Sequence, residues 1–428
     1  FVNSDLVSSI KFSAGGYGAQ YGDKMSSVLD IQYKKPTEFG GSATLSLLGA
    51  NLHLEGANKS KTLSYLLGVR NKSNQYLLNS LETQGEYKPS FTDVQSFIDY
   101  KFNNKFSMST LLNYSRNKYQ HIPSNKTTRF GTISVPLELR IYFEGQEVDS
   151  YETFFGAHEF KYLPKSNLKL QMTLSAFQTF ESETFDILGQ YWLSEVDNDL
   201  GSETFGESTF NIGVGSHLDH ARNYLKATVY NAEHKGVYFK DDFEFRWGIK
   251  SQREIIKDEI NEWTLIDSSD FSLPHPADSI GLGIQNPTPF YLNEALRTSI
   301  KLDSYRHTAY MQFSQQLGKF DLTSGIRTSY WDLNEEYLFS PRVSLSYQPL
   351  WQNDIVFRFS TGYYYQSPFY RELRDFNGKI NYDIKSQKSI HFVLGSDYNF
   401  KIWQRPFKLV SEVYYKDITD LIPYEVEM

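Results

Sequence analysis

The sequence predicts an all-β protein that forms a transmembrane antiparallel β-barrel of about fifteen strands. Short segments alternate apolar with polar residues, as strands do when one face meets an apolar medium and the other meets water. The connections between these segments switch regularly between very short and long, as the two rims of a membrane barrel do. Aromatic residues make up 16% of the chain, yet its mean hydropathy is -0.49 and no apolar run reaches the length of a membrane helix.

Composition excludes several classes of functional site. The 428-residue chain has no cysteine, which rules out disulfides, thiolate metal sites and cysteine nucleophiles. Its formal net charge of -8 is modest and its lysines and arginines are scattered, so we expect no nucleic-acid partner. The chain starts at Phe1-Val2-Asn3 without the basic and apolar series of a signal peptide, so we expect a cleaved leader or an internal piece of a longer protein.

Three segments show the alternation most clearly. Apolar side chains recur at every second position from Phe106 to Tyr114 and from Leu168 to Ala176, with mainly polar residues between them. After Val237 a third apolar face opposes a face of charged residues, namely Lys240, Asp242, Glu244, Arg246 and Lys250. Because so dense a charged face is unfavourable in a dry core, we expect it to line a wet lumen.

The connections predict how the strands are oriented. Tight polar turns are expected at 103–105, 164–166, 231–236, 318–319, 352–354 and 403–405. Longer connections, which should face the cell exterior, are expected near 72–90, 118–149, 181–216, 254–299 and 370–384. Their alternation requires an additional hairpin near Gly49, which makes the number of strands odd. Because unpaired strand edges are costly in lipid, we expect more strands after Met428 or in another chain.

Residues 1–37 have a different pattern from the barrel segments at 38–428. A strand-like stretch at 6–12 precedes the motif Gly15-Gly16-Tyr17-Gly18-Ala19-Gln20-Tyr21-Gly22, which is followed by Ser26-Ser27-Val28-Leu29-Asp30-Ile31. A phosphate-binding loop would have to open a helix, whereas 26–33 alternates as a strand does, so the sequence does not support phosphate binding here. We expect the glycines to allow tight turns and close approach of the backbone to its neighbours.

This order of strand, glycine-rich motif and first barrel strand resembles the end of the plug domain of TonB-dependent outer-membrane receptors. The segments 339–345, 363–368 and 412–416 are similar to barrel segments of that family as it occurs in Bacteroidota. The resemblance implies that 1–37 is the C-terminal part of a plug and that 38–428 is the N-terminal two-thirds of a barrel of about 22 strands. The plug-end motif residues would be Gly15, Gly16, Gly18, Ala19, Tyr21, Gly22, Ser26 and Ser27.

The resemblance also implies a location, a function and partners. A receptor of this family lies in the bacterial outer membrane and imports a scarce nutrient, such as a siderophore, cobalamin, glycan or peptide, by binding and gated passage. Its partners would be outer-membrane lipid, the TonB complex reached through a region before Phe1, the ligand, and a surface lipoprotein lid. The alternative is a barrel of the same ancestry that serves as a structural or docking subunit of a larger cell-surface or secretion complex. A soluble all-β binding protein is disfavoured by the charged strand faces.

Candidate ligand contacts lie in two of the expected long connections. Residues 181–216 combine many carboxylates with aromatic rings, which would suit a cation or a stacked sugar, whereas the alternative is an acidic, solvated loop. Residues 263–291 contain several prolines, which favours either a stiff docking element or an ordered loop without a ligand. The candidate residues are Tyr191, Trp192, Asp197, Trp263, Asp267 and His275.

The sequence predicts no catalytic site, bound metal or cofactor. None of the nine histidines forms a His-x-x-x-His or His-Glu-x-x-His pair, and the neighbours His158 and Glu159 would point to opposite faces of a strand. No Gly-x-Ser-x-Gly nucleophile motif occurs, and no pair of carboxylates stands out from the acidic background. We therefore expect a protein that binds and transports rather than an enzyme.

Overall fold

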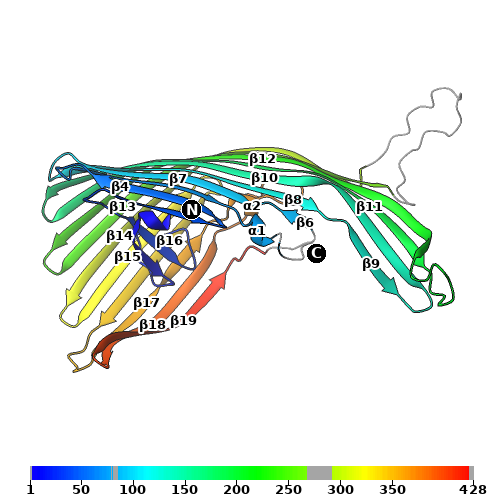
Figure 1. Ribbon diagram of the computed structural model, residues 1–428. Coiled ribbons are helices and arrows are strands. Elements are labelled where there is room, and N and C mark those ends of the chain that lie inside the picture. The colour runs from blue at the N-terminus through cyan, green and yellow to red at the C-terminus, as the bar shows by residue number, and fades with distance from the viewer. Residues whose placement is uncertain (1, 79, 81–84, 268–291, 424–428) are drawn as a thin grey trace.

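The computed structural model describes residues 2–78, 80, 85–267 and 292–423 (Figure 1). At the N-terminus a short 3-10 turn, η1 (Ser4–Leu6), leads into β1 (Val7–Ser13), which pairs with β2 (Val28–Tyr33) in a separate two-stranded sheet. All later strands belong to one antiparallel sheet that curls into a barrel. The predicted all-β barrel is therefore confirmed.

The barrel sheet contains long strands and two short ones. The bounds are β3 (Gly40–Ser46), β4 (Gly49–Ala57), β5 (Leu63–Lys72), β6 (Gly85–Tyr87), β7 (Ser90–Lys101), β8 (Phe106–Pro123), β9 (Lys126–Gly131), β10 (Pro136–Lys165), β11 (Leu168–Val196), β12 (Ser208–Lys240), β13 (Phe243–Asp267), β14 (Glu294–Leu317), β15 (Phe320–Trp331), β16 (Glu336–Tyr347), β17 (Asp354–Gln366), β18 (Gln387–Ile402) and β19 (Arg405–Thr419). The helices are α1 (Gln75–Leu78) and α2 (Tyr370–Leu373). In the part of the chain that the structure describes, no helix is long and apolar enough to cross a membrane.

Consecutive long strands pair as antiparallel neighbours around the barrel. The short strands β6 and β9 lie beside β8 and β10, so fifteen of the described strands β3–β19 follow one another along the wall. Residue-by-residue pairing runs continuously from β3 to β19, and the side chains of these two end strands are mostly exposed. The hairpin expected near Gly49 is present as the β3–β4 pair.

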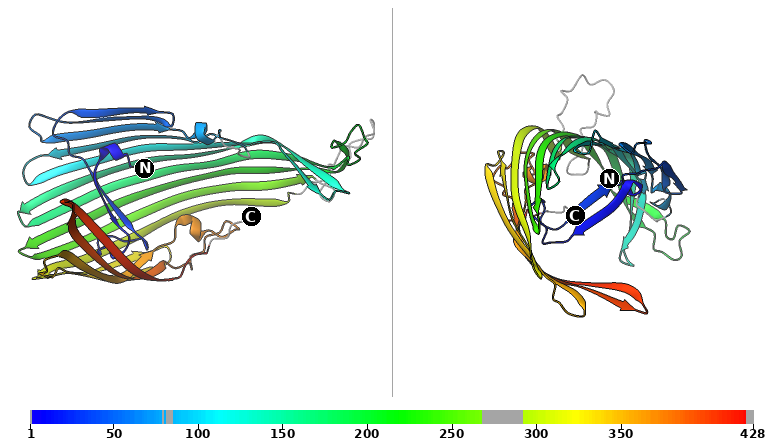
Figure 2. Two further views of the ribbon diagram at one scale, coloured as in Figure 1. Left: turned by 60° about the horizontal axis from the view of Figure 1, so that its bottom comes forward. Right: turned by 90° about the vertical axis from the view of Figure 1, so that its left-hand side faces the viewer.

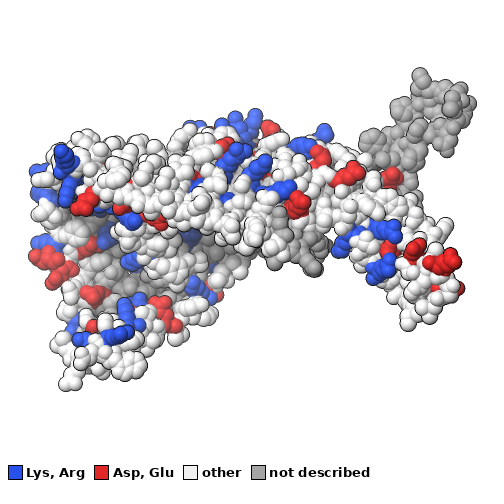
Figure 3. All heavy atoms as spheres, in the orientation of Figure 1, with Lys and Arg blue, Asp and Glu red and all other residues white. Residues whose placement is uncertain are grey.

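The outer face carries an apolar belt that ends at a charged row. Strand pairing aligns Arg116, Glu152, Phe180, Lys226, Lys257 and Lys301 in one row across β8 and β10–β14. Between this row and the tight turns, exposed outer side chains are largely apolar, as in Leu112, Phe154, Met172, Leu174, Met311 and Phe313. The nine residues 154–162 of β10 match the length of a membrane-crossing strand. Figure 3 shows this largely uncharged zone between the charges at the turn end and those near the middle of the sheet.

Strands β10–β14 continue well beyond the belt, which corrects several sequence predictions. The long connections expected at 118–149 and 181–216 are mostly strand, because β8 reaches Pro123, β10 begins at Pro136, β11 reaches Val196 and β12 begins at Ser208. In the connection expected at 254–299, residues 254–267 belong to β13 and residues 294–299 belong to β14. The tight turn expected at 231–236 is also wrong, because β12 runs on to Lys240 with partners on both sides. Pairing with two neighbouring strands outweighs the local turn preference of Asn231 and Gly236.

Candidate functional site

The N-terminal segment lies inside the barrel. Figure 2 shows β1 and β2, in blue, within the ring of barrel strands. Leu6 is completely buried, and the backbone N–H of Asn3 donates a hydrogen bond of 3.1 Å to Oε1 of Gln95 on β7. Further along, the glycine-rich segment (residues 14–27) crosses to the opposite wall, formed by β14–β19. The lumen therefore contains part of its own chain.

Three of the four glycines of this segment, Gly16, Gly18 and Gly22, lie so close to the wall that an added Cβ would be within 3.0 Å of a wall atom. A Cβ atom added to Gly18 would lie 2.4 Å from Oε1 of Gln312, and one added to Gly22 would lie 2.0 Å from Nε of Arg327. Gly16 has a φ of +64°, and its Cβ would lie 2.7 Å from Cβ of Ser360. The close backbone approach expected from the sequence is therefore present.

One arginine of the wall holds the backbone of this segment. Arg342 on β16 is 5% exposed, and its Nη1 donates hydrogen bonds to the carbonyl oxygens of Tyr17 (3.4 Å), Gly18 (2.8 Å) and Tyr21 (2.6 Å). Its guanidinium carbon also lies 5.1 Å from the ring centre of Tyr17 and 4.3 Å from that of Tyr364. Charge-assisted hydrogen bonds and cation–π contacts both strengthen where water is excluded, so this arginine is a principal anchor.

The other motif residues also make defined contacts. Ala19 is 1% exposed, and its N–H donates to Oε1 of Gln312 at 2.9 Å. The Tyr21 hydroxyl donates to Asp30 at 2.6 Å, and burial together with this hydrogen bond raises the pKa of Tyr21 to about 12. Nζ of Lys416 donates to the carbonyl of Ser26 at 3.3 Å. Gly15 lies in ordinary contact with the wall, and Ser27 is half-buried.

A second segment also enters the lumen from the opposite end. The connection between β17 and β18 (residues 367–386, here called the inner loop) contains α2 and contacts the lumenal side of several strands. The Thr298 hydroxyl donates to the carbonyl of Gly378 at 3.1 Å, and the backbone N–H and hydroxyl of Ser386 both donate to the carboxylate of Glu336. Leu373 is 1% exposed. The inner loop is therefore an ordered part of the passage.

Two carboxylates of the wall bind the inner loop through its arginines. Asp258 on β13 is 3% exposed and accepts hydrogen bonds from the Tyr370 hydroxyl at 2.8 Å and from Nη1 of Arg374 at 2.9 Å. Burial and the bond to Asp258 raise the pKa of Tyr370 well above its usual range. On β11, Glu181 accepts from Nη2 of Arg371 at 2.7 Å. These contacts fix α2 against the wall.

Replacing Asp258 with asparagine is expected to release the inner loop. The neutral amide loses the charge that attracts Arg374 and leaves buried donors poorly paired, which costs about 1–3 kcal/mol. The 367–386 region should then be cut by trypsin at least about fivefold faster than in the parent protein, because opening becomes more frequent. Glu259→Gln, on the outer face of the same strand, is the control, and equal cleavage rates in both variants would contradict the role of Asp258.

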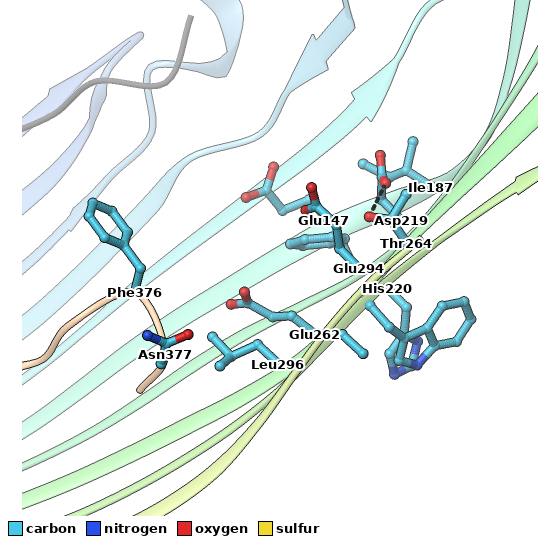
Figure 4. A pocket seen from close by; sticks show the side chains of 13 residues that line it. Glu147, Ile187, Asp219, His220, Glu262, Thr264, Glu294, Leu296, Phe376 and Asn377 are labelled. Carbon is cyan, nitrogen blue, oxygen red and sulfur yellow. Dashed lines mark hydrogen bonds between the residues drawn. The ribbon is translucent and has the colours of Figure 1, made fainter. Parts of the chain in front are cut away.

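A cavity of about 670 Å³ opens above the inner loop, at the mouth of the lumen. Figure 4 shows Glu147, Asp219, Glu262 and Glu294 around this space, with Phe376 and Asn377 of the inner loop opposite them. A second cavity of about 390 Å³ lies deeper and is lined by Asp23 and Lys24 of the glycine-rich segment, by Phe369 and Tyr370 of the inner loop, and by wall residues including Lys250, Arg306 and Trp331. The two cavities and the inner loop mark a route from the mouth to the N-terminal segment.

Among the described residues, those predicted to contact a ligand do not come together in one site. Tyr191 and Trp192 are neighbours on β11 and so point to opposite faces, and the Trp192 ring packs edge-on against Tyr142 at 5.1 Å. Trp263 and His220 are among the residues that line the mouth cavity, but their rings stack on each other at 4.6 Å, and Figure 4 shows His220 on the far side of the strands from the carboxylates. Asp267 ends β13, and His275 lies outside the described residues.

Asp197 lies in the connection between β11 and β12, where it organises a turn. Its carboxylate accepts hydrogen bonds from the backbone of Asp199 at 2.9 Å and from the Thr204 hydroxyl at 2.7 Å. Hydrogen bonds from Ser202 and Thr204 lower the pKa of Asp197. Across residues 2–78, 80, 85–267 and 292–423, no group of three or more histidine, aspartate and glutamate side chains is placed to hold a metal ion.

Sequence reasoning placed Glu181 and Glu183 in an acidic loop at 181–216 and did not single out Glu147 and Asp149. Glu147 and Asp149 on β10, and Glu181 and Glu183 on β11, are spaced two residues apart and therefore share one face of their strands. That spacing is visible in the sequence, but it lies in segments that were expected to be loops. A period-two search for carboxylates would have found the pattern.

Comparison with known proteins agrees with the fold. The model of the family described as TonB dependent receptor-like, beta-barrel matches residues 11–425. Among solved structures, the outer membrane transporter YddB from Escherichia coli has a TM-score of 0.58 at 9% identity, covering 94% of this chain and 55% of that one. A variant of the ferric enterobactin receptor PfeA from Pseudomonas aeruginosa has a TM-score of 0.56 at 15% identity, with coverage of 97% and 58%.

A third similar structure, the RagAB peptide importer, has a TM-score of 0.51 at 8% identity and covers 86% of this chain and 44% of its own. No curated protein matches the sequence. The chain thus spans little more than half the length of the first structures it matches, and at such identities the likeness concerns the fold. Because the family model extends over nearly all of the 428 residues, the chain belongs to the TonB-dependent receptor β-barrel family, a family of transport receptors in the bacterial outer membrane.

Proposed function

We propose that this chain forms the ligand passage of an importer, in which the N-terminal segment closes the lumen and shifts to admit a nutrient. In this proposal residues 1–37 are the C-terminal part of a plug, and 38–428 supply the surrounding wall. The observation that carries it is the polar attachment of the glycine-rich segment through Arg342 and Gln312. Water can replace hydrogen bonds of this kind when the segment moves, whereas an apolar seal would resist hydration.

The two cavities support a stepwise passage. A ligand would first occupy the mouth cavity, where four carboxylates and Phe376 surround it. Displacement of the inner loop would then expose the deeper cavity, whose floor includes Asp23 and Lys24 of the N-terminal segment. Movement of that segment, driven through the TonB complex, would complete the passage.

The class of nutrient differs among similar structures. They are described as receptors or importers for ferric enterobactin, ferric citrate and a peptide, respectively. For this chain we propose a siderophore, cobalamin, glycan or peptide as the imported ligand, and a surface lipoprotein as a further partner at the mouth. The residues proposed to receive the ligand are those of the mouth cavity.

A disulfide clamp tests this proposal. A Cβ added to Gly15 would lie 3.4 Å from Cγ2 of Val393 on β18, so Gly15→Cys with Val393→Cys should cross-link the segment to the wall, and the 428 residues contain no other cysteine. Labelled siderophores, cobalamin, glycans and peptides are screened for uptake that falls when the gene or TonB is deleted. The clamp should abolish that uptake, a reductant should restore it, and Gly15→Cys alone should leave it unchanged.

Two results would contradict the proposal. Normal uptake through the fully cross-linked receptor would show that the N-terminal segment need not move. Absence of any TonB-dependent uptake, together with loss of a cell-surface complex on gene deletion, would favour the structural or docking subunit instead.

A further inference from the structure

The lumenal wall at the mouth carries carboxylates in a regular array. Strand pairing aligns the inner face of β10–β14 into four rows, which contain, from the mouth inward, Asp219 and Glu294, then Glu147 and Glu262, then Asp149 and Glu183, then Glu181 and Asp258. Each row thus contributes two carboxylates. Among the described strand residues of these four rows there is no lysine or arginine. We call these eight residues the acidic rows.

The acidic rows lie above the apolar belt, where the wall rises into water. On β10, Glu152 belongs to the charged row that ends the apolar belt on the outer face. The adjacent residue, Tyr151, lies in the innermost acidic row on the lumenal face, so that row is at the level where the belt ends. The rows therefore surround the entry rather than the membrane-crossing part of the lumen. Figure 4 shows carboxylates of the two acidic rows nearest the mouth directed toward a common space.

Among the described residues, Glu147 and Asp219 have ion-pair contacts only with histidines, His121 at 3.8 Å and His217 at 3.9 Å. Asp219 accepts from the Thr264 hydroxyl at 2.9 Å, and Glu262 accepts from the Asn223 amide at 2.5 Å. Within the described residues, no group donates a hydrogen bond to Oδ1 of Asp149, although that atom is shielded from water. Carboxylates this close together repel one another, and the repulsion strengthens as water is displaced, so a bound cation would stabilise the array.

The protein itself shows which groups these rows accept. The innermost row already binds cations, because Glu181 pairs with Arg371 at 2.7 Å and Asp258 pairs with Arg374 at 2.9 Å. Both arginines belong to the inner loop rather than to the wall. The loop therefore occupies the innermost row as a cationic ligand would, whereas the two rows nearest the mouth line the cavity.

We propose that the mouth binds an elongated polycation, such as an extended basic peptide, and that this ligand competes with Arg371 and Arg374 for the innermost row. Successive rows are two residues apart, which corresponds to about 7 Å along a strand. An extended peptide with a basic residue at every second position repeats its charges at the same interval. Apolar groups in the cavity, Phe185, Ile187 and Phe376, would contact the parts of the ligand between its charges.

This inference rests on the proposed function, since it names the class of ligand that enters the same cavity. Competition by the ligand for Glu181 and Asp258 would release α2 and open the way to the deeper cavity. Binding would thereby be coupled to movement of the inner loop through the carboxylates that both share.

Binding of two labelled pentapeptides to the full-length receptor in detergent tests the inference. One peptide alternates arginine with serine, and the other alternates glutamate with serine. The basic peptide should bind at least about tenfold more tightly than the acidic one, and its affinity should fall steeply as salt is raised. Equal affinity for the two peptides would overturn the inference.

Matched variants locate the site. Glu147→Gln with Glu262→Gln, on the lumenal face of β10 and β13, should weaken binding of the basic peptide at least about tenfold. The control, Glu144→Gln with Glu259→Gln, removes two exposed carboxylates from the outer face of the same strands and should leave affinity unchanged. An equal loss in both pairs would show that the attraction is a general surface effect and would overturn the inference.

A loop variant tests the competition. Arg371→Gln removes one internal cation while Arg374 still pairs with Asp258, so the basic peptide should bind about three times more tightly. Unchanged or weaker binding would refute the competition.

Uptake measurements distinguish failure of this inference from failure of the proposed function. Basic-peptide binding without TonB-dependent uptake of any nutrient would reject the function alone, whereas TonB-dependent uptake without peptide binding would reject this inference alone.

Discussion

Replacing Arg342 with methionine is expected to detach the glycine-rich segment from the wall. Methionine fills part of the space but offers no donor, so the carbonyls of Tyr17, Gly18 and Tyr21 lose their shared partner. A hydrogen bond to a charged group contributes about 1.5–3 kcal/mol, and the two shorter bonds together set an expected loss of at least about 3 kcal/mol. The fraction of molecules in which the glycine-rich segment is detached from the wall should then rise roughly hundredfold.

Hydrogen–deuterium exchange of residues 14–27 in the full-length receptor measures this change. Amides of the segment should exchange much faster in Arg342→Met, while amides of the barrel strands stay protected. The control is Arg253→Met, which removes an arginine paired with Asp303 on the outer face. If the segment exchanges equally slowly in both variants, Arg342 does not anchor it.

Replacing Gly16 with alanine is expected to have the second largest effect. The φ of +64° costs an L-residue about 1–2 kcal/mol, and the new Cβ would also lie 2.7 Å from Cβ of Ser360, which cannot rotate away. Both effects oppose seating of the segment, so its amides should again lose protection. Gly15→Ala is the matched control, because there the nearest wall atom, Cγ2 of Val393, lies at an ordinary 3.4 Å.

A double variant separates the two causes. Gly16→Ala combined with Ser360→Gly removes the clash and leaves the backbone strain, so protection should be partly recovered. Full protection in Gly16→Ala alone would contradict the close approach at this position. Full recovery in the double variant would assign the whole effect to the clash.

Local patterns predicted the strands but not the lumen. The alternation from Phe106 to Tyr114 and from Leu168 to Ala176 identified the outer face correctly, because each strand meets lipid at every second side chain. The glycines at 16, 18 and 22 were correctly interpreted as sites of close approach. What they approach could not be predicted, since Gly18 and Gln312 are almost three hundred residues apart.

The failures have a common physical cause. Residues 181–196 are rich in acidic side chains, which resemble a solvated loop in a single sequence, yet they continue β11 because β10 and β12 pair with it on both sides. The inner loop was expected only as a long connection. Its attachment depends on the pairing of Arg374 with Asp258, 116 residues away, for which no local pattern exists.

A scan of single cysteines along β11, each carrying a nitroxide label, tests the central claim that this wall separates hydrocarbon from a wet lumen. We expect period-two accessibility from 170 to 180, with even-numbered labels reached by oxygen dissolved in lipid and odd-numbered labels reached by a water-soluble relaxation agent. From 182 to 194 both faces should be reached by the water-soluble agent. A scan without alternation between 170 and 180, or with lipid exposure continuing to 194, would show that β11 does not separate hydrocarbon from a wet lumen in this way.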